Sequence, residues 1–445
     1  MRVIVIGGDA AGMSAASQVK RLKPEYEVVV FERGKYISYA ACGIPYFISG
    51  AVKDMDSLIE VTPEEAREKR KVDLRLGHTA VSIDPSNHTV TVESDGSHSL
   101  EPFDRLLIAT GARPQTLGID LSRYHNVFTM NDLYDAERIH HFLAAHRPRS
   151  VAVIGGGYIG LEAVESFAEQ GISTMLVHRR EDLHRAFEKE LSDIIKEKLS
   201  EKGVILNLGQ PFNGLEQKGE KIGIVRESDV LEVDAVLLAI GVEPNSGIAA
   251  DAGIQLGVNK AIRVNEFMET TAETIYAAGD CATSSLGSFG LDVHAPLALK
   301  ANKQGMLAGM NIAGERESFA GVLNTSITKI FDLGVARTGL SFAQAQELDL
   351  DPEKILVQSR DRARYYPGSS RITSLVIISR KDRRVLGAQL AGKIESVKRI
   401  DVYTTAIYNH MTIDELFNLD LAYAPPFSPV YDPVLLAARV ARKKV

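Results

Sequence analysis

The sequence has 445 residues, of which 45% are hydrophobic and 24% charged, and its formal net charge at pH 7 is −7. At roughly 100–200 residues per domain this length suggests two to four domains. The sequence gives no sign of nucleic-acid binding, since it has no long basic run, or of membrane binding, since it has no apolar run of about 20 residues.

The cellular location is suggested by the two cysteines and by the start of the chain. Two cysteines in this length argue against a disulfide-bonded secreted protein. Met1 and Arg2 run straight into a buried-strand pattern, without the features of a secretory leader. We therefore expect a cytoplasmic protein.

The chain opens with an apolar strand, residues 3–6, then a glycine turn and a helical pattern. Gly7 and Gly12 match the outer glycines of a dinucleotide-binding turn, whereas Asp9 stands at the middle position. Such a turn lets the backbone approach a pyrophosphate, and the helix N-terminus offers N–H groups to it. A second strand ends at Glu32, which we predict to accept hydrogen bonds from ribose hydroxyls. The alternative is that Glu32 is an ordinary surface acid.

Cys42 follows in a segment whose Gly43 and Pro45 predict a turn entering a helix. A cysteine at a helix N-terminus has a lowered pKa and more of the nucleophilic thiolate. A buried, inert thiol is the usual alternative, but the polar neighbours and the nearby nucleotide turn favour a reactive one. No second cysteine lies within a few residues. We therefore predict a mixed disulfide with a small thiol, or a sulfenic acid, instead of an intrachain disulfide.

Residues 151–160 repeat the opening pattern of strand, glycine turn and helix. The three glycine positions are all matched, by Gly155, Gly157 and Gly160. The position of the acid is taken by basic side chains: His178, Arg179, Arg180 and Arg185. Guanidinium groups bind a 2′-phosphate bidentately, whereas an acid repels it. We therefore predict a second nucleotide unit that takes NADPH, with NADH as the alternative donor and solvated surface arginines as the alternative interpretation.

Later strands end in small-residue turns, at residues 106–111, 236–241 and 274–280. Asp280 stands at the mouth of the last of these and is a candidate for binding a sugar-alcohol chain, or for capping a helix. Cys281 beside it is expected to pack in the core. After about residue 321, antiparallel strands at 372–378 and 385–390 and a helix at 400–408 predict a third, α+β domain.

Together these residues resemble the pyridine nucleotide-disulfide oxidoreductases. The single cysteine in residues 38–46 is similar to that of the coenzyme A-disulfide reductase branch, as are the motifs at 365–368 and 421–427. The resemblance implies an α/β fold with two Rossmann-like domains. These would be an FAD-binding domain (1–112 and 244–320) and an NAD(P)-binding domain (113–243), followed by an α+β dimerisation domain (321–445).

The resemblance also implies a working homodimer, in which the third domain of one subunit covers the cysteine site of its partner. There Tyr365 and Tyr423 would assist the thiol chemistry, unless they are packing aromatics, and Tyr158 would gate the nicotinamide face of the flavin. Coenzyme A, as substrate or bound thiol, is polyanionic and needs cations, for which Arg21 and Lys303 are candidates, with solvated surface charge as the alternative. Gln18 and Ser38 are the other predicted coenzyme A contacts. The other cofactor-contacting residues implied are Arg33, Ser38, Val81, Thr110, Gly111 and Gly241.

Two positions depart from relatives in this family. Ala41 precedes the cysteine where some coenzyme A-disulfide reductases carry Asn, and Ala10 stands where oxygen- or peroxide-reducing relatives carry His. We expect an FAD-dependent NAD(P)H reductase of coenzyme A disulfide, a small-molecule substrate, with no metal. The alternatives are a coenzyme A-dependent polysulfide, persulfide or sulfur reductase, an NAD(P)H oxidase, and a non-enzymatic flavin redox sensor.

Overall fold

The computed structural model describes residues 1–184, 186–227 and 229–445, which group into two compact units. The first unit comprises Met1–Gln115, Asn131–Arg138 and Gly241–Val322. The second comprises Thr116–Met130, Ile139–Ile240 and Leu323–Val445. The second unit thus contains most of two predicted domains, those for NAD(P) binding and dimerisation, and the division into three domains stays a prediction.

A parallel sheet forms the centre of the first unit, with the strand order β18-β7-β1-β2-β3. Its strands are β1 (Arg2–Ile6), β2 (Glu27–Glu32), β3 (Asp73–Leu76), β7 (Arg105–Ile108) and β18 (Ile275–Ala277). Residues 3–6 of β1 are all buried, as expected for a central strand covered on both faces. The strands predicted at 3–6, before Glu32, and at the start of 106–111 and 274–280 are confirmed.

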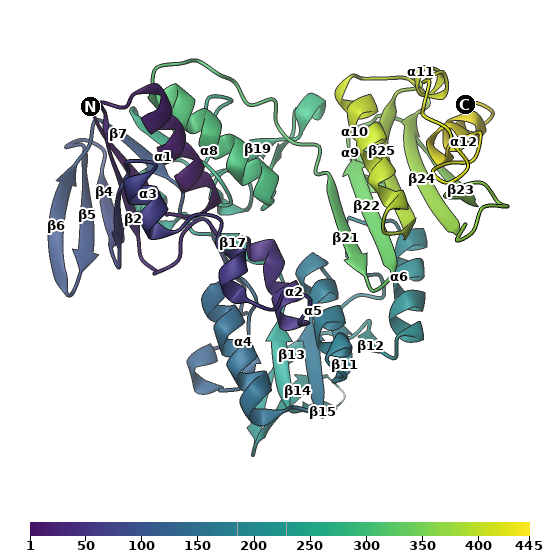
Figure 1. The fold of residues 1–445 in the computed structure, drawn as a ribbon, viewed down its shortest axis with the longest axis horizontal. Helices are drawn as coiled ribbons and strands as arrows, with labels where there is room; N and C mark the ends of the chain where they lie inside the picture. The colour runs from purple at the N-terminus through teal and green to yellow at the C-terminus, as the bar shows by residue number, and fades with distance from the viewer. Residues whose placement is uncertain (185, 228) are drawn as a thin grey trace. The chain divides into compact units, whose positions relative to one another are not determined.

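Two helices lie side by side on this sheet, α1 (Ala10–Leu22) and α8 (Ala298–Ile312) (Figure 1). Their backbones approach closely at Gly305, where an added Cβ would stand 2.2 Å from the backbone oxygen of Ala11. A larger residue at this position would therefore force the helices apart.

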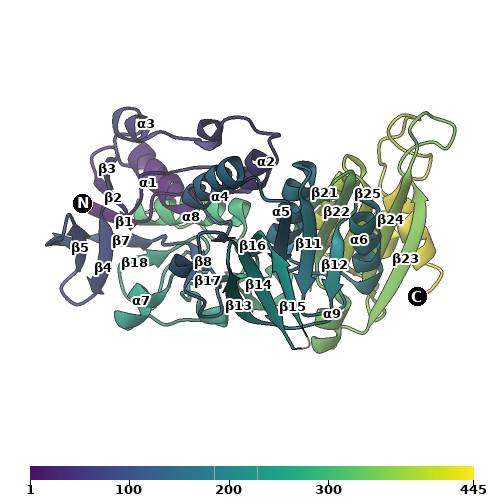
Figure 2. The ribbon, with the colours of Figure 1, turned by 90° about the horizontal axis from the view of Figure 1, so that it is seen from below.

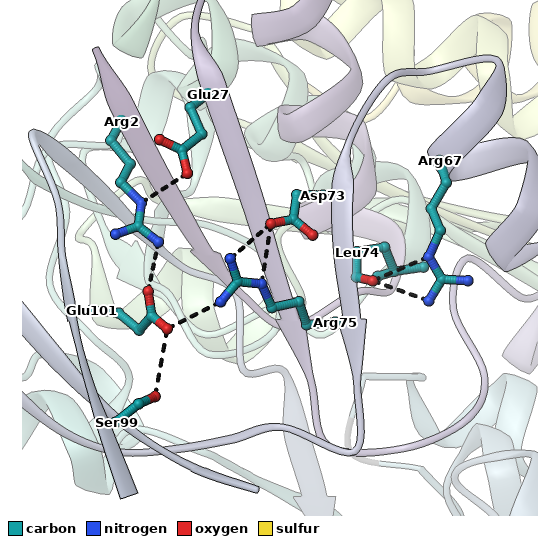
Figure 3. A network of polar contacts seen from close by, with 8 residues as sticks. All are labelled: Arg2, Glu27, Arg67, Asp73, Leu74, Arg75, Ser99 and Glu101. Atoms are coloured by element: carbon teal, nitrogen blue, oxygen red, sulfur yellow. Dashed lines mark hydrogen bonds and ion pairs between the residues drawn. The ribbon is translucent and has the colours of Figure 1, made fainter.

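A three-stranded antiparallel meander adjoins the parallel sheet of this unit, with β4 (Thr79–Asp84), β5 (Thr89–Ser94) and β6 (Ser97–Pro102). Glu101 on β6 connects the two sheets, because its carboxylate bonds Arg2 of β1 at 2.5 Å and Arg75 of β3 at 3.0 Å (Figure 3). The remaining helices and strands of the unit are α2 (Ile44–Ile48), α3 (Pro63–Glu68), β8 (Ala112–Pro114), β17 (Val242–Pro244), α7 (Gly247–Asp251), β19 (Ser284–Ser285) and β20 (Asp292–Val293).

The second unit contains another parallel sheet, ordered β12-β11-β10-β16-β9. Its strands are β9 (Val127–Phe128), β10 (Ser150–Ile154), β11 (Ser173–His178), β12 (Ile205–Leu208) and β16 (Ala235–Leu238). This sheet repeats the βαβ arrangement of the first, as the sequence repeat predicts. The other elements of this part are α5 (Tyr158–Glu169), α6 (Lys189–Glu201), β13 (Phe212–Lys218), β14 (Lys221–Arg226) and β15 (Val230–Val233). Helix α4 (Leu133–His146) begins in the first unit and continues in the second.

An antiparallel sheet completes this unit, in the order β21-β22-β25-β24-β23. The strands are β21 (Ser326–Ile330), β22 (Leu333–Gly339), β23 (Pro352–Arg360), β24 (Arg371–Ser379) and β25 (Val385–Lys393). The helices are α9 (Phe342–Glu347), α10 (Ile400–Tyr408), α11 (Ile413–Phe417) and α12 (Pro433–Ala441). The strands predicted at 372–378 and 385–390 and the helix at 400–408 are confirmed.

Helices α5 and α6 pack between the two sheets of the second unit (Figure 2). On its far side the antiparallel sheet contacts α12 through β23 and β24. Across the described ranges, no helix has both the length and the apolar character needed to cross a bilayer.

Candidate active site

The first glycine turn has the geometry that a dinucleotide requires. Gly7 has φ +105°, and a Cβ on Gly12 would stand 1.9 Å from the backbone oxygen of Gly7. Asp9 is the N-cap of the following helix α1, and its side chain makes no capping hydrogen bond. The N-terminus of α1 can therefore offer N–H groups to a phosphate.

Glu32 ends β2 next to this turn. Its two carboxylate oxygens accept hydrogen bonds from the backbone N–H groups of Gly8 and Gly34, both at 2.8 Å. These bonds fix the orientation of the carboxylate while leaving lone pairs for ribose hydroxyls.

Asp280 follows β18, which pairs with β7 at the edge of the same parallel sheet. Its Oδ1 atom is buried and has no hydrogen-bond partner among the described residues. Burial raises the pKa of this carboxyl, and the nearby Lys300 and His294 oppose that rise. An orphaned buried oxygen beside a dinucleotide turn fits the sugar-alcohol chain of FAD, which supports the assignment made from the sequence.

Cys42 is exposed and lies in a 3₁₀ turn, Ala41–Gly43, that leads directly into α2. The predicted turn into a helix is therefore present, although α2 is only five residues long. Two hydrogen bonds fasten this segment to the glycine turn: Ser38 N–H donates to the oxygen of Gly8 at 3.0 Å, and Tyr39 N–H donates to Asp9 at 3.2 Å. The thiol thus belongs to the same local structure as the nucleotide turn.

The second cysteine is different. Cys281 is fully buried, and its Sγ bonds the backbone oxygens of Ile108 and Ala278. Burial raises the pKa of this thiol. The prediction of a packing role for Cys281 is confirmed.

Asp9 explains why the middle glycine can be absent. Its side chain turns toward the N–H of Tyr39 and supports the Cys42 segment. Burial, with further contributions from Glu32 and Asp280, raises the pKa of Asp9 to about 6. This carboxyl therefore takes up a proton as the pH falls through about 6, and a nearby phosphate would raise its pKa further.

The second glycine turn repeats this geometry. Gly155 has φ +119°, and a Cβ on Gly160 would stand 1.9 Å from the oxygen of Gly155. His178 Nδ1 accepts a hydrogen bond from Gly156 N–H at 3.2 Å, at the place that Glu32 occupies in the first unit. Neutral His178 consequently carries its hydrogen on Nε2 and can donate it.

Basic side chains surround this position. Burial, followed by the charges of Arg180 and Arg179, lowers the pKa of His178. Arg179 is exposed and Arg180 half-buried, directly after β11. Arg185, also predicted to bind the nucleotide, lies outside the described residues.

Tyr158 opens α5 directly after Gly157. Its hydroxyl hydrogen bonds Ser326 of β21, and its ring centre lies 4.0 Å from that of His184. Burial raises the pKa of Tyr158 and lowers that of His184 to about 4. His184 has no motif in the sequence that would single it out, and the gating role of Tyr158 stays a prediction.

The two predicted tyrosines come together. Tyr365 and Tyr423 lie on separate exposed loops, close enough to share a hydrogen bond. Desolvation and the contact with Tyr365 raise the pKa of Tyr423. The exposed hydrophobic side chains nearby in the chain include Phe427, Val430 and Tyr431.

Arg399, which the sequence analysis did not single out, holds both loops. Its guanidinium donates to the backbone oxygens of Asp361 and Phe427, and its Nε pairs with Asp432 at 2.8 Å. A separate hydrogen bond joins the loops directly, from Ala363 N–H to the oxygen of Pro425 at 3.1 Å. Arg399 starts α10 and has no sequence signal that distinguishes it from a surface arginine.

Three of the predicted coenzyme A contacts lie on the paired helices of the first unit. Arg21 on α1 is exposed and donates to the buried Gln18 at 2.7 Å, and Lys303 is exposed on α8. The fourth, Ser38, has φ +43° and precedes the Cys42 turn. This arrangement offers exposed positive charge on both helices.

The remaining predicted contacts occupy loops and one strand. Thr110 Oγ1 donates to the oxygen of Asn245 at 2.6 Å, and the oxygens of Gly111 and Gly241 accept from Asn245 and Gln115. Arg33 is exposed after β2. Val81 is exposed at a pairing irregularity of β4, between Ala80 and Ser82. Their cofactor contacts stay predictions.

Comparison with known proteins places this geometry in a family. Residues 1–305 match the family model of the pyridine nucleotide-disulphide oxidoreductases, and residues 325–433 match the dimerisation domain of that family. The chain is 40% identical, over 99% of its length and 98% of the relative, to the NAD(P)H sulfur oxidoreductase (CoA-dependent) of Pyrococcus abyssi. It is 30% identical, over 99% of both chains, to the coenzyme A disulfide reductase of Staphylococcus haemolyticus.

A solved structure supports the same conclusion. The NAD-dependent persulfide reductase from A. fulgidus matches with a TM-score of 0.96 and 38% identity, over 100% of this chain and 83% of that one. The family resemblance and the α/β fold class inferred from the sequence are thus confirmed. The chain belongs to the pyridine nucleotide-disulphide oxidoreductase family and is a flavoprotein disulfide oxidoreductase.

Proposed function

We propose that this chain uses NAD(P)H to reduce sulfur–sulfur bonds that carry coenzyme A, with Cys42 as the reacting residue. One observation carries the proposal: the exposed Cys42 turn is hydrogen bonded to the first glycine turn, through Ser38 to Gly8 and Tyr39 to Asp9. The same local structure therefore presents a nucleotide site and an accessible thiol.

The chemistry at Cys42 is thiol–disulfide exchange. Its thiolate attacks a disulfide of coenzyme A, which forms a mixed disulfide with one coenzyme A and expels the other as a thiolate. Bound FAD supplies the hydride chemistry that brings two electrons from NAD(P)H to this mixed disulfide. Reduction then restores the Cys42 thiolate and releases the second coenzyme A thiol after uptake of one proton.

Coenzyme A is polyanionic, so its binding groove needs cations. Arg21 and Lys303 provide exposed positive charge on α1 and α8, and Gln18 buttresses Arg21. Reduction of coenzyme A disulfide is the activity named for the Staphylococcus haemolyticus relative.

Persulfide or polysulfide is the second candidate acceptor. It is favoured by the 40% identical sulfur oxidoreductase and by the persulfide reductase whose fold matches. With coenzyme A persulfide, the same attack by Cys42 at the coenzyme A sulfur forms the same mixed disulfide and expels hydrosulfide. The two candidates thus differ in the leaving group and share every later step.

The donor is proposed to be NADPH in preference to NADH. His178, Arg179 and Arg180 stand where an acid would discriminate against a 2′-phosphate, and the acceptor role of His178 Nδ1 leaves a donor on Nε2. Guanidinium groups at this position suit a phosphate.

The working form is proposed to be a homodimer in the reducing cytoplasm, where a single reactive thiol persists. The matched dimerisation domain and its exposed apolar side chains support this assembly. Tyr365 and Tyr423 of the partner subunit would then face Cys42 and supply a proton to the departing thiolate. Tyr423 carries its proton at neutral pH, since desolvation and the contact with Tyr365 raise its pKa above the ordinary value of a phenol.

An anaerobic substrate panel tests the proposal, with NADPH as donor and coenzyme A disulfide, coenzyme A persulfide and polysulfide as acceptors. Cys42→Ser is expected to abolish turnover of all three while NADPH still bleaches the flavin absorbance. Cys281→Ser is the matched control and should retain turnover. Turnover of coenzyme A disulfide by Cys42→Ser would contradict the proposal.

The panel also separates the remaining alternatives. Oxygen consumption equal to NADPH use, in air and without a disulfide, would identify an oxidase. FAD binding with an unreactive Cys42 and slow NADPH oxidation against every acceptor would identify a redox sensor.

A further inference from the structure

Lys300 is a buried cation in the first unit. It lies on α8, only 2% of its surface is exposed, and its Nζ donates to the backbone oxygens of Gly279 and Ala282 at 3.0 and 3.1 Å. Burial lowers the pKa of this ammonium, whereas the nearby Asp280 opposes that change. Burial of a charged group costs free energy unless a partner of opposite charge or hydrogen bonds compensate it, so a buried ammonium at this position needs an explanation.

Gln304 lies one helical turn further along α8 and hydrogen bonds to the backbone of the same Gly279–Thr283 segment. Its Oε1 accepts from Gly279 N–H at 3.1 Å, and its Nε2 donates to the oxygen of Thr283 at 2.9 Å. Gln304 is fully buried. Two α8 side chains thus bind backbone groups on both sides of Asp280.

Lys300 carries a positive charge, whereas Gln304 is neutral. A neutral amide such as Gln304 can hold a turn at little electrostatic cost, so hydrogen bonding alone does not require an ammonium at position 300. The orphaned Oδ1 of Asp280 lies in the segment that Lys300 holds. Of the two charges that lower the pKa of Asp280, those of Lys300 and His294, that of Lys300 has the larger effect.

We propose that Lys300 is a positioning residue for flavin binding: its ammonium fixes the Gly279–Ala282 turn and keeps Asp280 as a carboxylate that accepts hydrogen bonds from FAD hydroxyls. The proposal rests on FAD binding by this family and is independent of which disulfide Cys42 reduces. It assigns to a buried helix residue a role that sequence motifs do not reveal.

Within the part of the chain that the structure describes, four titratable groups lie around Asp280. Lys300 comes from α8, His294 bonds the backbone oxygen of Asp280 at 2.8 Å, Asp9 comes from the start of α1, and Cys281 follows in the chain. Burial raises the pKa of Asp280, and Lys300 and then His294 lower it. Removing the ammonium should therefore raise the pKa of Asp280, so that the carboxyl takes up its proton at a higher pH.

The test measures FAD release from the purified holoenzyme as the pH is lowered, followed by the fluorescence of released FAD. Lys300→Met removes both charge and hydrogen bonds, whereas Lys300→Gln removes the charge and keeps an amide donor. In both variants the release midpoint should rise by about one pH unit, a shift of the size that a neighbouring charge produces. Lys69→Gln, the same charge loss at an exposed side chain, should leave it unchanged.

A wild-type release midpoint in Lys300→Gln would overturn the proposal, since it would show that the charge is dispensable. If Lys300→Met does not fold, Lys300→Gln carries the test, and its thermal melt with excess FAD shows that the fold is intact. Because FAD retention is the readout, loss of disulfide reduction through a failure at Cys42 cannot be mistaken for this effect.

Discussion

The guanidinium of Arg399 donates a 2.6 Å hydrogen bond to the backbone oxygen of Phe427. The same side chain reaches the oxygen of Asp361 at 3.0 Å. One residue at the start of α10 therefore holds the loop of Tyr423 and the loop of Tyr365 in one arrangement.

Arg399→Lys is expected to disturb the positions of Tyr365 and Tyr423 and to leave the nucleotide sites unchanged. A lysine ammonium lacks the planar fork that bonds several acceptors at once. We expect kcat for coenzyme A disulfide to fall about tenfold, which corresponds to about 1.4 kcal/mol, while NADPH bleaches the flavin at the wild-type rate. Steady-state assays measure kcat, and stopped-flow absorbance measures the rate of flavin bleaching. Arg384→Lys is the control, because Arg384 pairs with Asp382 at a separate hairpin. An unchanged kcat in Arg399→Lys would refute the role of these loops.

Arg179→Ala and Arg180→Ala test the choice of nucleotide. Hydrogen bonds to a charged group contribute roughly 1.5–3 kcal/mol, so each variant should raise the KM for NADPH about 10- to 100-fold. The KM for NADH serves as the internal control and should change little, since NADH lacks the 2′-phosphate. Equal losses with both nucleotides would mean that these arginines do not recognise that phosphate.

The strands and both glycine turns could be predicted from the sequence because their signals are local. Residues 3–6 and 151–154 are continuous apolar runs of central parallel strands, and Gly12 and Gly160 are required by contacts within their own turns. Even the exception at Asp9 has a local basis, since its carboxylate turns to the N–H of Tyr39.

The supporting residues could not be predicted, because their roles depend on distant partners. In the sequence Lys300 looks like an ordinary helix lysine. Only the fold shows that its ammonium donates hydrogen bonds to the backbone oxygens of Gly279 and Ala282. The same holds for the packing of α5 and α6 against β21, which puts Tyr158 beside Ser326. Such contacts carry no local pattern in the chain.

The network around Glu101 should contribute to stability. Its side chain is 14% exposed and is bonded by Arg2 and Arg75. Glu101→Gln should therefore cost about 1–2 kcal/mol, between the values of exposed and buried ion pairs, and lower the midpoint of urea unfolding. Glu27→Gln is the matched control. Glu27 is 56% exposed and pairs with the same Arg2, so this substitution should change the free energy of unfolding by close to zero. Equal effects of the two variants would contradict this account of Figure 3.

Asp9 should make the stability of the FAD-free protein depend on pH. The pKa of this carboxyl rises from 3.8 to about 6 in the folded chain, so folding favours the protonated form. This stabilising contribution is complete below pH 4 and is lost as the pH rises through about 6. Above that pH the buried carboxylate costs on the order of 3 kcal/mol relative to the protonated form. Asp9→Asn keeps an oxygen for the Tyr39 N–H without the charge. The variant should therefore unfold at a higher temperature than the wild type at pH 8 and at the same temperature at pH 4. Melting curves that stay parallel across this range would show that Asp9 titrates like an exposed acid.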